Sequence, residues 1–581
     1  MNLQVTQDRI DAVDATTDAG SSVVASGSHP GVHIDVRGLS RRVRVRRDEV
    51  TLVDGASLTV AAGQLVAIIG PSGAGKTTLL EAIAGLAPAI AGSVRYDGID
   101  VYDNLGAFRS VLGYVPQDDI IHTDLPLGRT LHYAARLRLP SSATAREIDD
   151  AVRHALGAVG LADQADVRVG SLSGGQRKRA SIAVELLTDP HVFFLDEPTS
   201  GLDPVTSAEL ITRLRQLADH LATVVFTTHS VEDLARCDRV VFMTRGGRVG
   251  FVGTVDEALA LFGVDSIPEL YRRLADGDVA THIDTAAPLP ATDHDRQAVI
   301  RRPAANWLTQ WRVLTRRTLE TLTRNRLTLA ILLGSPAMVI AMFAILFRRG
   351  AFDLHDPSPS SMVMIGFWVV FAAFFFRLTY GLLQICTERT ILRREHLVGL
   401  RLGAYVASKV TVLVPFLLVV IVSMLAVLRL LDRMPGRPLA TYASIGVGLL
   451  LCAIAALGLG LLTSAAVSNV SQATLALPML CFPAVLFSGA ILPVHLMAST
   501  GAALSTVIPS RWAFEALGHD LGAREILAEG GSPLGPPLLN SYGDAGTYST
   551  GTYWVILAAF AVVFLVATWQ VLVRTTRGPM R

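Results

Sequence analysis

A glycine-rich octapeptide, GPSGAGKT at residues 70–77, has the residue types and spacing of a loop that binds phosphate groups. It follows the apolar run Leu65–Ile69, which predicts a buried strand, and it precedes a helical pattern. Glycines let backbone N–H groups curl around a phosphate, and the start of the next helix adds positive dipole. Lys76 would reach the β- and γ-phosphates of a nucleotide, and the Thr77 hydroxyl would bind Mg²⁺. A tight glycine turn without a ligand would not require the full motif. The predicted nucleotide contacts of this loop are Gly70, Pro71, Ser72, Gly73, Ala74, Gly75, Lys76, Thr77 and Thr78.

Two adjacent carboxylates, Asp196 and Glu197, end the apolar run Val192–Leu195. This position puts them at the carboxyl edge of a sheet, beside the phosphate loop. Asp196 suits Mg²⁺, usually through water, and Glu197 is placed to polarise an attacking water. The order strand-Asp-Glu-Pro argues against the alternative of a surface acidic pair. The two motifs together predict hydrolysis of ATP with Mg²⁺.

Two further polar side chains follow predicted strands. His229 follows the strand 223–227 and is placed to contact the γ-phosphate and orient the water. Gln117, in the sequence YVPQDD, follows another short strand, and its neutral amide would sense Mg²⁺ and water. The predicted catalytic residues are Glu197, His229 and Gln117. The predicted metal-binding residues are Thr77, Gln117 and Asp196.

The strands that position these side chains alternate with helical patterns, which predicts a mostly parallel sheet covered by helices. A further strand is expected at Arg239–Met243. The composition then divides the chain into parts. Polar segments lie before and after the predicted strands and helices, and long apolar runs begin after residue 327. The predicted domains are a flexible tail at 1–31, a nucleotide-binding domain at 32–274, a linker at 275–306 and a membrane domain at 307–581.

The composition limits the partners of the chain. It has 581 residues, 17% charged residues and a formal net charge of +1, and its mean hydropathy is positive. These values indicate a chain partly in lipid and argue against nucleic acid as the main partner. The arginine-rich segment 41–47 has a period of two, which predicts one solvated strand face instead. The four cysteines form no CxxC pair, so neither a zinc site nor a disulfide framework is indicated.

Six apolar runs are near the roughly 20 residues that a helix needs to cross a bilayer. Arginines gather before the first run, between the second and third, and after the sixth. All three clusters fall on one side of the membrane, which the positive-inside rule makes cytoplasmic. We therefore expect a plasma-membrane protein whose nucleotide-binding domain and both termini are cytoplasmic, with segment 493–552 external. The predicted spans are 327–347, 362–386, 410–431, 443–467, 473–492 and 553–573.

The sequence LSGGQ at residues 172–176 resembles the signature motif of ATP-binding cassette transporters. The resemblance implies that Ser173 and Gly175 bind the γ-phosphate of a nucleotide held by the other subunit's loop 70–77. The sequence SGLD at residues 200–203 resembles the loop that crosses the dimer. The further nucleotide contacts implied by the resemblance are Ser173, Gly174, Gly175, Gln176 and Asp203.

The order of domains, with the cassette first and the spans second, narrows the resemblance to the ABCG (White) group. This resemblance covers nearly the whole chain from about residue 32. This implies an α/β P-loop NTPase cassette domain followed by an all-α polytopic membrane domain of six helices. One cassette and one set of spans imply a half-transporter, and intact motifs favour a homodimer over a heterodimer. Segment 388–395 with Lys409 resembles the group's coupling region. Arg129 stands where the group commonly has Glu, so we expect an altered contact between cassette and membrane domain.

Arg377 lies within the second predicted span. A charge there costs about 2.5–3.5 kcal/mol if it faces lipid, so the side chain either lines a translocation cavity or snorkels to the interface. The resemblance implies a cavity at the dimer axis, lined by the second and fifth spans. The residues nominated for it are Phe376, Arg377, Phe482, Val485 and Ile491.

The resemblance implies ATP-driven export of a hydrophobic or amphipathic substrate, such as a lipid, glycolipid or drug-like molecule. The expected partners are a second copy of the chain, membrane lipid and that substrate, with no nucleic acid. Import is a rival within transport, although a fused cassette argues against it. A membrane-held ATPase that signals or remodels without moving solute is a rival from another class.

Overall fold

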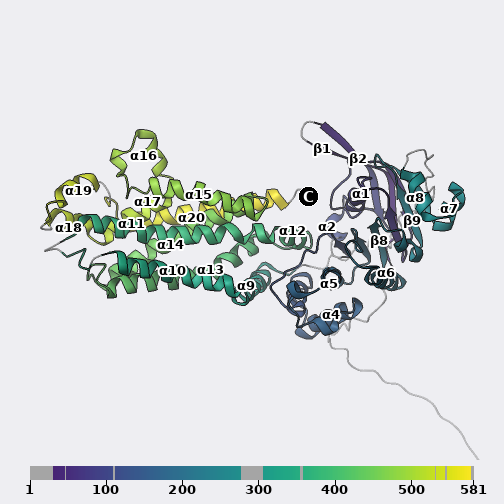
Figure 1. The fold of residues 1–581 in the computed structure, drawn as a ribbon, viewed down its shortest axis with the longest axis horizontal. Coiled ribbons are helices and arrows are strands. Elements are labelled where there is room, and N and C mark those ends of the chain that lie inside the picture. The colour runs from purple at the N-terminus through teal and green to yellow at the C-terminus, as the bar shows by residue number, and fades with distance from the viewer. Residues whose placement is uncertain are drawn as a thin grey trace, which may run out of the picture.

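The computed structural model is elongated, with the cassette domain at one end and a bundle of long helices at the other (Figure 1). The predicted tail, up to residue 30, and residues 276–304 of the predicted linker lie outside the described residues. Arg46 and Arg47 of the arginine-rich segment lie outside them too. The structure describes residues 31–45, 48–108, 111–220, 222–275, 305–347, 349–353, 357–529, 532–542 and 546–576.

A six-stranded sheet forms the centre of the cassette domain. Its strands are parallel except for the edge strand β10, which pairs antiparallel with β9. Apolar residues fill the central strands because helices cover both faces, as in other parallel sheets. The carboxyl ends of the parallel strands therefore meet at one edge. The order is β10 (Val249–Gly253), β9 (Arg239–Met243), β3 (Leu65–Ile69), β8 (Thr223–Thr228), β7 (Val192–Leu195) and β6 (Leu112–Val115).

A second, antiparallel sheet has the order β2 (Asp48–Val60), β1 (Ile34–Val45), β4 (Ala91–Tyr96) and β5 (Ile99–Asp100). The arginine-rich segment lies on β1, as predicted, and Arg42 is exposed. The expectation of one solvated face is wrong for Arg41, which is buried and pairs with Glu81 at 3.2 Å. The β1–β2 register shifts on both sides of Arg41, and such irregularities redirect a side chain.

The cassette helices connect these strands and cover the sheet. Among them α1 begins within the phosphate loop, α5 begins within LSGGQ and α6 follows the segment SGLD. Helix α4 begins with a capping box between Thr144 and Glu147. The helices are α1 (Lys76–Ile83), α2 (Leu105–Phe108), α3 (Leu127–Arg138), α4 (Ala145–Ala158), α5 (Gly174–Leu186), α6 (Pro204–Asp219), α7 (Val255–Phe262) and α8 (Ile267–Ala275).

Helices make up the described part of the membrane domain. Short helices cap the end far from the cassette, whereas the C-terminal end of α20 returns to the cassette side (Figure 1). The helices are α9 (Trp307–Arg324), α10 (Arg326–Leu346), α11 (Pro359–Gln384), α12 (Arg389–Leu397), α13 (Leu402–Leu430), α14 (Leu439–Ala466), α15 (Val470–Leu486), α16 (Ser499–Ser505), α17 (Pro509–Asp520), α18 (Ala523–Glu529), α19 (Gly535–Tyr542) and α20 (Thr550–Thr576).

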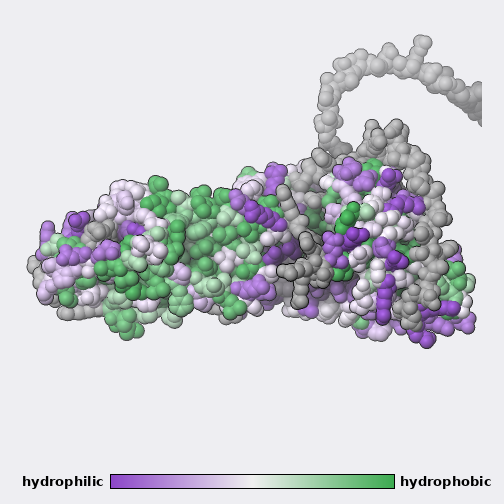
Figure 2. Space-filling view, turned by 90° about the horizontal axis from the view of Figure 1, so that it is seen from above, coloured by the Kyte–Doolittle hydropathy of each residue, from purple (hydrophilic) through white to green (hydrophobic). Residues whose placement is uncertain are grey.

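Four helical stretches in the described residues have the length and apolar composition to cross a membrane. Shorter apolar helices occupy Ala337–Leu346 and Val470–Leu486. Each predicted span overlaps a helix, but the count of six spans stays a prediction. Figure 2 shows a hydrophobic band around the middle of the bundle, with polar residues at both ends. The four long stretches are Pro359–Leu397, Leu402–Leu430, Leu439–Ala466 and Thr550–Thr576.

Glycines bring α11 and α14 into close contact. A Cβ atom on Gly381 would lie 2.7 Å from the carbonyl oxygen of Leu457, and one on Gly460 would lie 2.5 Å from that of Leu378. Small residues let helix backbones approach in this way, so dispersion contacts join the two helices without a large side chain between them.

Candidate nucleotide-binding site

The loop 70–77 joins β3 to α1 at the carboxyl edge of the sheet. Gly75 caps α1 with a φ of 92°, and a Cβ there would lie 2.2 Å from the carbonyl oxygen of Leu52. Only glycine fits this turn. The Lys76 ammonium donates to the carbonyl oxygens of Gly70 at 2.9 Å and Pro71 at 3.3 Å, so it lies inside the curl of the loop. Burial lowers the pKa of Lys76, against the opposing influence of the nearby carboxylates.

The Asp196 carboxylate lies against this loop. Its Oδ1 accepts hydrogen bonds from the Thr77 hydroxyl at 3.0 Å and the Thr227 hydroxyl at 2.6 Å. Burial raises the pKa of Asp196, although both hydroxyls oppose the shift. A carboxylate beside a hydroxyl at a phosphate loop is the hard-oxygen donor set that Mg²⁺ prefers, so these side chains fit the ion.

Glu197 has a φ of 45°, which is uncommon for a residue other than glycine. Its Oε2 accepts a hydrogen bond from Gln117 Nε2 at 3.2 Å and lies 3.6 Å from His229 Nδ1. The structure thus brings together the three residues predicted as catalytic. They come from the ends of three different strands, β6, β7 and β8. A strained backbone at such a carboxylate is consistent with a functional constraint on its direction.

The sequence reasoning missed two positioning residues. Thr227 donates to Asp196, and its oxygen accepts from the backbone N–H of Glu197 at 2.8 Å. Lys178 of α5 is buried and donates to the carbonyl oxygens of Pro116 at 3.2 Å and Gln117 at 2.7 Å. Burial lowers the pKa of Lys178. The only signal for Thr227 was a polar residue at the end of an apolar strand.

Ser173 and Asp203 cap helices within the chain. The Ser173 hydroxyl accepts from the backbone N–H of Gln176 at 3.3 Å, and the Gln176 side chain accepts from the N–H of Ser173 at 3.0 Å. Asp203 accepts from the backbone N–H groups of Val205 and Thr206. Since a helix N-terminus favours anions, the start of α5 suits a phosphate. Contact with a second copy's nucleotide stays a prediction.

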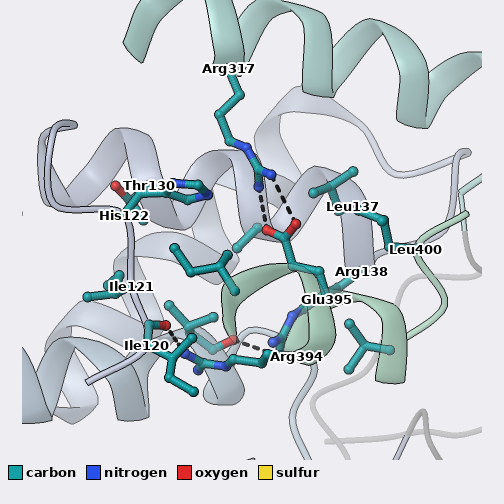
Figure 3. A pocket seen from close by; sticks show the side chains of 14 residues that line it. Ile120, Ile121, His122, Thr130, Leu137, Arg138, Arg317, Arg394, Glu395 and Leu400 are labelled. Atoms are coloured by element: carbon teal, nitrogen blue, oxygen red, sulfur yellow. Dashed lines mark hydrogen bonds and ion pairs between the residues drawn. The ribbon is translucent and has the colours of Figure 1, made fainter. Parts of the chain in front are cut away.

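Arg394 of α12 enters the cassette domain (Figure 3). Its guanidinium donates to the Glu185 carboxylate at 2.7 Å, the Ile120 carbonyl at 2.6 Å and the Ser181 carbonyl at 2.8 Å. Arg138 also pairs with Glu185, at 2.7 Å. Burial would raise the pKa of Glu185, but the two arginines lower it to about 2. The predicted coupling region therefore contacts α5 and the segment that follows Gln117.

Further ion pairs surround this contact. Arg317 of α9 pairs with Glu395 (Figure 3). Within the membrane domain, Glu388 pairs with Lys409 at 2.8 Å and accepts a hydrogen bond from the Tyr405 hydroxyl at 2.8 Å. Such paired buried charges fix a geometry rather than add much stability.

Arg129, where the resemblance implied an altered contact, pairs with Glu320 of α9 at 2.8 Å. The Tyr133 hydroxyl donates to the same carboxylate at 2.6 Å, and Arg324 donates to it at 3.0 Å. Burial would raise the pKa of Glu320, but hydrogen bonds and the positive charges lower it to about 2. The cassette domain thus holds the first helix of the membrane domain through one carboxylate.

The residues nominated for a substrate cavity do not line one common cavity of the single chain. Phe376 lines a cavity between α11, α13, α9 and the cassette domain, and it also lines a small cavity together with Arg377. Arg377 is 1% exposed and lies among residues of α10, α11 and α13. On and after α15, Phe482 is 66% and Ile491 53% exposed, and Val485 is half-buried. A shared cavity at a dimer axis stays a prediction.

The comparisons agree with this two-domain arrangement. A profile described as ABC transporter matches residues 53–200, and one described as ABC-2 type transporter matches residues 309–519. The ABC transporter ATP-binding/permease protein of Mycobacterium tuberculosis is 32% identical over 555 residues, covering 92% of this chain and 62% of that protein. ABC transporter G family member 14 of Arabidopsis thaliana is 36% identical over 222 residues, covering 37% of this chain and 34% of that protein.

A shorter relative is covered more fully. Nod factor export ATP-binding protein I of Rhizobium meliloti is 34% identical over 235 residues, which is 40% of this chain and 68% of that protein. The chain spans less than two thirds of the length of the Mycobacterium and Arabidopsis proteins. The chain belongs to the ATP-binding cassette transporters, with the cassette-first order of domains of ABCG-like half-transporters.

Proposed function

We propose that this protein couples ATP hydrolysis to export of a hydrophobic or amphipathic molecule. One observation carries the proposal: a four-residue segment contacts both the catalytic carboxylate and the membrane domain. Gln117 at its start donates to Glu197, and the carbonyl of Ile120 at its end accepts from Arg394. A shift at either end therefore moves the other, which is the coupling that a transporter needs.

The residues of the site divide the chemistry of hydrolysis. Lys76 and the backbone N–H groups of loop 70–77 bind the phosphates, and Thr77 and Asp196 would hold Mg²⁺, which neutralises phosphate charge when bound. The Glu197 carboxylate orients and polarises a water, with Gln117 and His229 fixing its direction. Hydrolysis then resets the contact at Arg394.

The working unit in this proposal is a dimer, since the chain has one cassette domain. Ser173 and Asp203 would meet the nucleotide held by a second cassette, and intact motifs favour a second copy over a different half-transporter. The arginine clusters support a plasma-membrane protein with a cytoplasmic cassette domain and termini. Export is supported by the fused cassette and by the name of the Rhizobium relative, Nod factor export ATP-binding protein I.

Proteoliposomes test the proposal. The full chain is reconstituted, ATP is supplied to the exposed cassette domains, and movement of labelled lipids, glycolipids and dyes is measured. We expect ATP-dependent movement of at least one probe. Glu197→Gln should still bind ATP while hydrolysis falls by about 100-fold or more, the usual contribution of a general base. The matched control is Glu209→Gln, an exposed carboxylate on α6.

Two results would contradict the proposal. Normal turnover in Glu197→Gln would remove the role assigned to that carboxylate. ATP hydrolysis by the wild type without movement of any probe would favour a membrane-held ATPase with a signalling or remodelling role.

A further inference from the structure

A cavity of about 820 Å³ lies where the cassette domain meets the membrane domain. Residues 118–124 of the cassette form one wall, and α9, α10, α11 and α13 contribute the others. Its volume falls in the range of pockets that hold drug-sized molecules, about 300–1,000 Å³. The wall of residues 118–124 directly follows Gln117 in the chain. It therefore continues the segment whose first residue donates to Glu197.

The cassette side of this cavity is acidic. The charged lining groups of the cavity are Asp118, Asp119 and Asp124 of the cassette domain and Glu388 and Lys409 of the membrane domain. Glu388 is neutralised by Lys409 at 2.8 Å, and Asp124 pairs with Arg168. Asp118 and Asp119 form no ion pair among the described residues and are exposed. Arg177, Lys178 and Arg394 approach Asp119 but line no part of the cavity.

His122 adds no positive charge to this wall near neutral pH. Burial and the neighbouring Arg317 guanidinium lower the pKa of His122 to about 4. Figure 3 shows its ring on the segment that also carries Ile120 and Ile121. Asp118 and Asp119 are thus the charged lining groups that form no ion pair among the described residues.

The membrane side of the cavity combines polar side chains, mostly threonines, with an aromatic and apolar part. Phe375, Phe376 and Tyr380 of α11 line it together with Leu322 of α9 and Leu413 of α13. Aromatic faces attract organic cations and repel anions. Two unpaired carboxylates and an aromatic wall that line the same cavity fit a molecule that is apolar and positively charged at once.

We propose that this cavity binds a hydrophobic organic cation and is the place where a transported molecule contacts both domains. This proposal adds a class of ligand to the proposed export function. It rests on that function only for the statement that the bound ligand is transported. A bound cation lies against residues 118–124, which continue into Gln117 and contact Arg394 through Ile120. Occupancy of the cavity therefore raises ATP hydrolysis.

Binding is tested with tetraphenylphosphonium and tetraphenylborate, which have the same shape and opposite charge. Equilibrium dialysis with the purified full chain in neutral detergent, without nucleotide, gives the Kd of each. We expect tighter binding of the cation. The double variant Asp118→Asn/Asp119→Asn should raise the Kd of tetraphenylphosphonium about fivefold, because the variant loses the charge attraction between the two carboxylates and the cation. The matched control is Asp163→Asn with Asp166→Asn, two exposed carboxylates outside the cavity.

A second variant tests the aromatic wall. Phe376→Leu keeps an apolar side chain but removes the ring, so the Kd of the cation should rise about threefold while that of tetraphenylborate changes less. Phe371→Leu on the same helix is the control, because Phe371 does not line the cavity. Unchanged thermal midpoints show that each variant folds.

The outcomes separate the site from the function. Equal binding of the two ions, or a Kd that no cavity variant changes, overturns the proposed site. A cation that binds there without raising ATP hydrolysis overturns the proposed link to Gln117. A cation that binds and stimulates hydrolysis but does not move across proteoliposomes leaves the site supported and contradicts its place in transport.

Discussion

Arg394 of the membrane domain and Glu185 of the cassette domain, 209 residues apart in the chain, share a buried hydrogen bond of 2.7 Å. The same guanidinium contacts the segment after Gln117 and the helix that begins at the LSGGQ motif. One side chain therefore touches both parts of the cassette that respond to nucleotide in the proposed mechanism.

Replacing Arg394 should separate hydrolysis from transport. Arg394→Gln removes the contacts with Glu185 and the Ile120 carbonyl, and breaking a buried charge pair costs about 3–5 kcal/mol. We expect the amount of probe moved per ATP hydrolysed to fall strongly, while hydrolysis falls less. The control is Arg393→Gln, because Arg393 donates to the carbonyl of Thr575 within the membrane domain. An unchanged ratio in Arg394→Gln would contradict the assigned role.

Reversing the pair between Arg129 and Glu320 should show direct coupling of the two residues. Arg129→Glu and Glu320→Arg should each lower the thermal midpoint and transport, because each replaces an ion pair of 2.8 Å with two facing like charges. The Arg129 side chain is 52% exposed, so the pair itself contributes only about 0.5–1 kcal/mol. The double variant should recover part of the loss. The recovery should be partial, because Arg324, which donates to Glu320 in the wild type, would face the arginine introduced by Glu320→Arg.

A double-mutant cycle on the thermal midpoint measures this coupling, with neutral Arg129→Gln and Glu320→Gln variants as reference. Strictly additive effects would show that Arg129 and Glu320 act independently.

Ser173→Asp should separate the capping role of Ser173 from its predicted nucleotide contact. Asp caps a helix as well as Ser does, so α5 should keep its stability. The added negative charge would oppose a γ-phosphate held by a second copy, and hydrolysis should fall about tenfold or more. The matched control is Thr144→Asp at the capping box of α4. If Ser173→Asp hydrolyses ATP like Thr144→Asp, Ser173 makes no such contact.

His122 should make the folded protein less stable in mild acid. Its folded pKa is lowered from 6.5 to about 4 by burial and the Arg317 charge. The unfolded chain therefore binds more protons between these values, so stability is fully present above pH 6.5 and falls as the pH falls toward 4. The pKa of Glu185 is lowered from 4.5 to about 2, so its contribution is lost only below pH 4.5.

The window between pH 4.5 and 6.5 isolates the effect of His122 from that of Glu185. Thermal midpoints of His122→Gln should change less across this window than those of the wild type. His154→Gln, at an exposed position on α4, is the control. Parallel profiles for His122→Gln and the wild type would contradict the prediction.

The nucleotide site followed from the sequence because its motifs are contiguous and end strands. Strands β3, β7 and β9 have the predicted bounds, and the predicted β8 was one residue short. The carboxyl ends of parallel strands converge, so the sequence predicts that Gln117, Glu197 and His229 lie at one site. Thr227 and Lys178 were missed because one polar residue in a strand or helix carries no pattern of its own.

The sequence by itself determined the class of protein and the order of its domains, and it predicted the residues that would face a nucleotide. Only the tertiary structure decided how the domains join: Arg394 with Glu185, Arg129 with Glu320, and the acidic cavity beside Gln117. The physical reason is that these contacts join residues far apart in the chain. Local periodicity fixes the face that a helix buries, but charge pairing between domains depends on where both helices end in space.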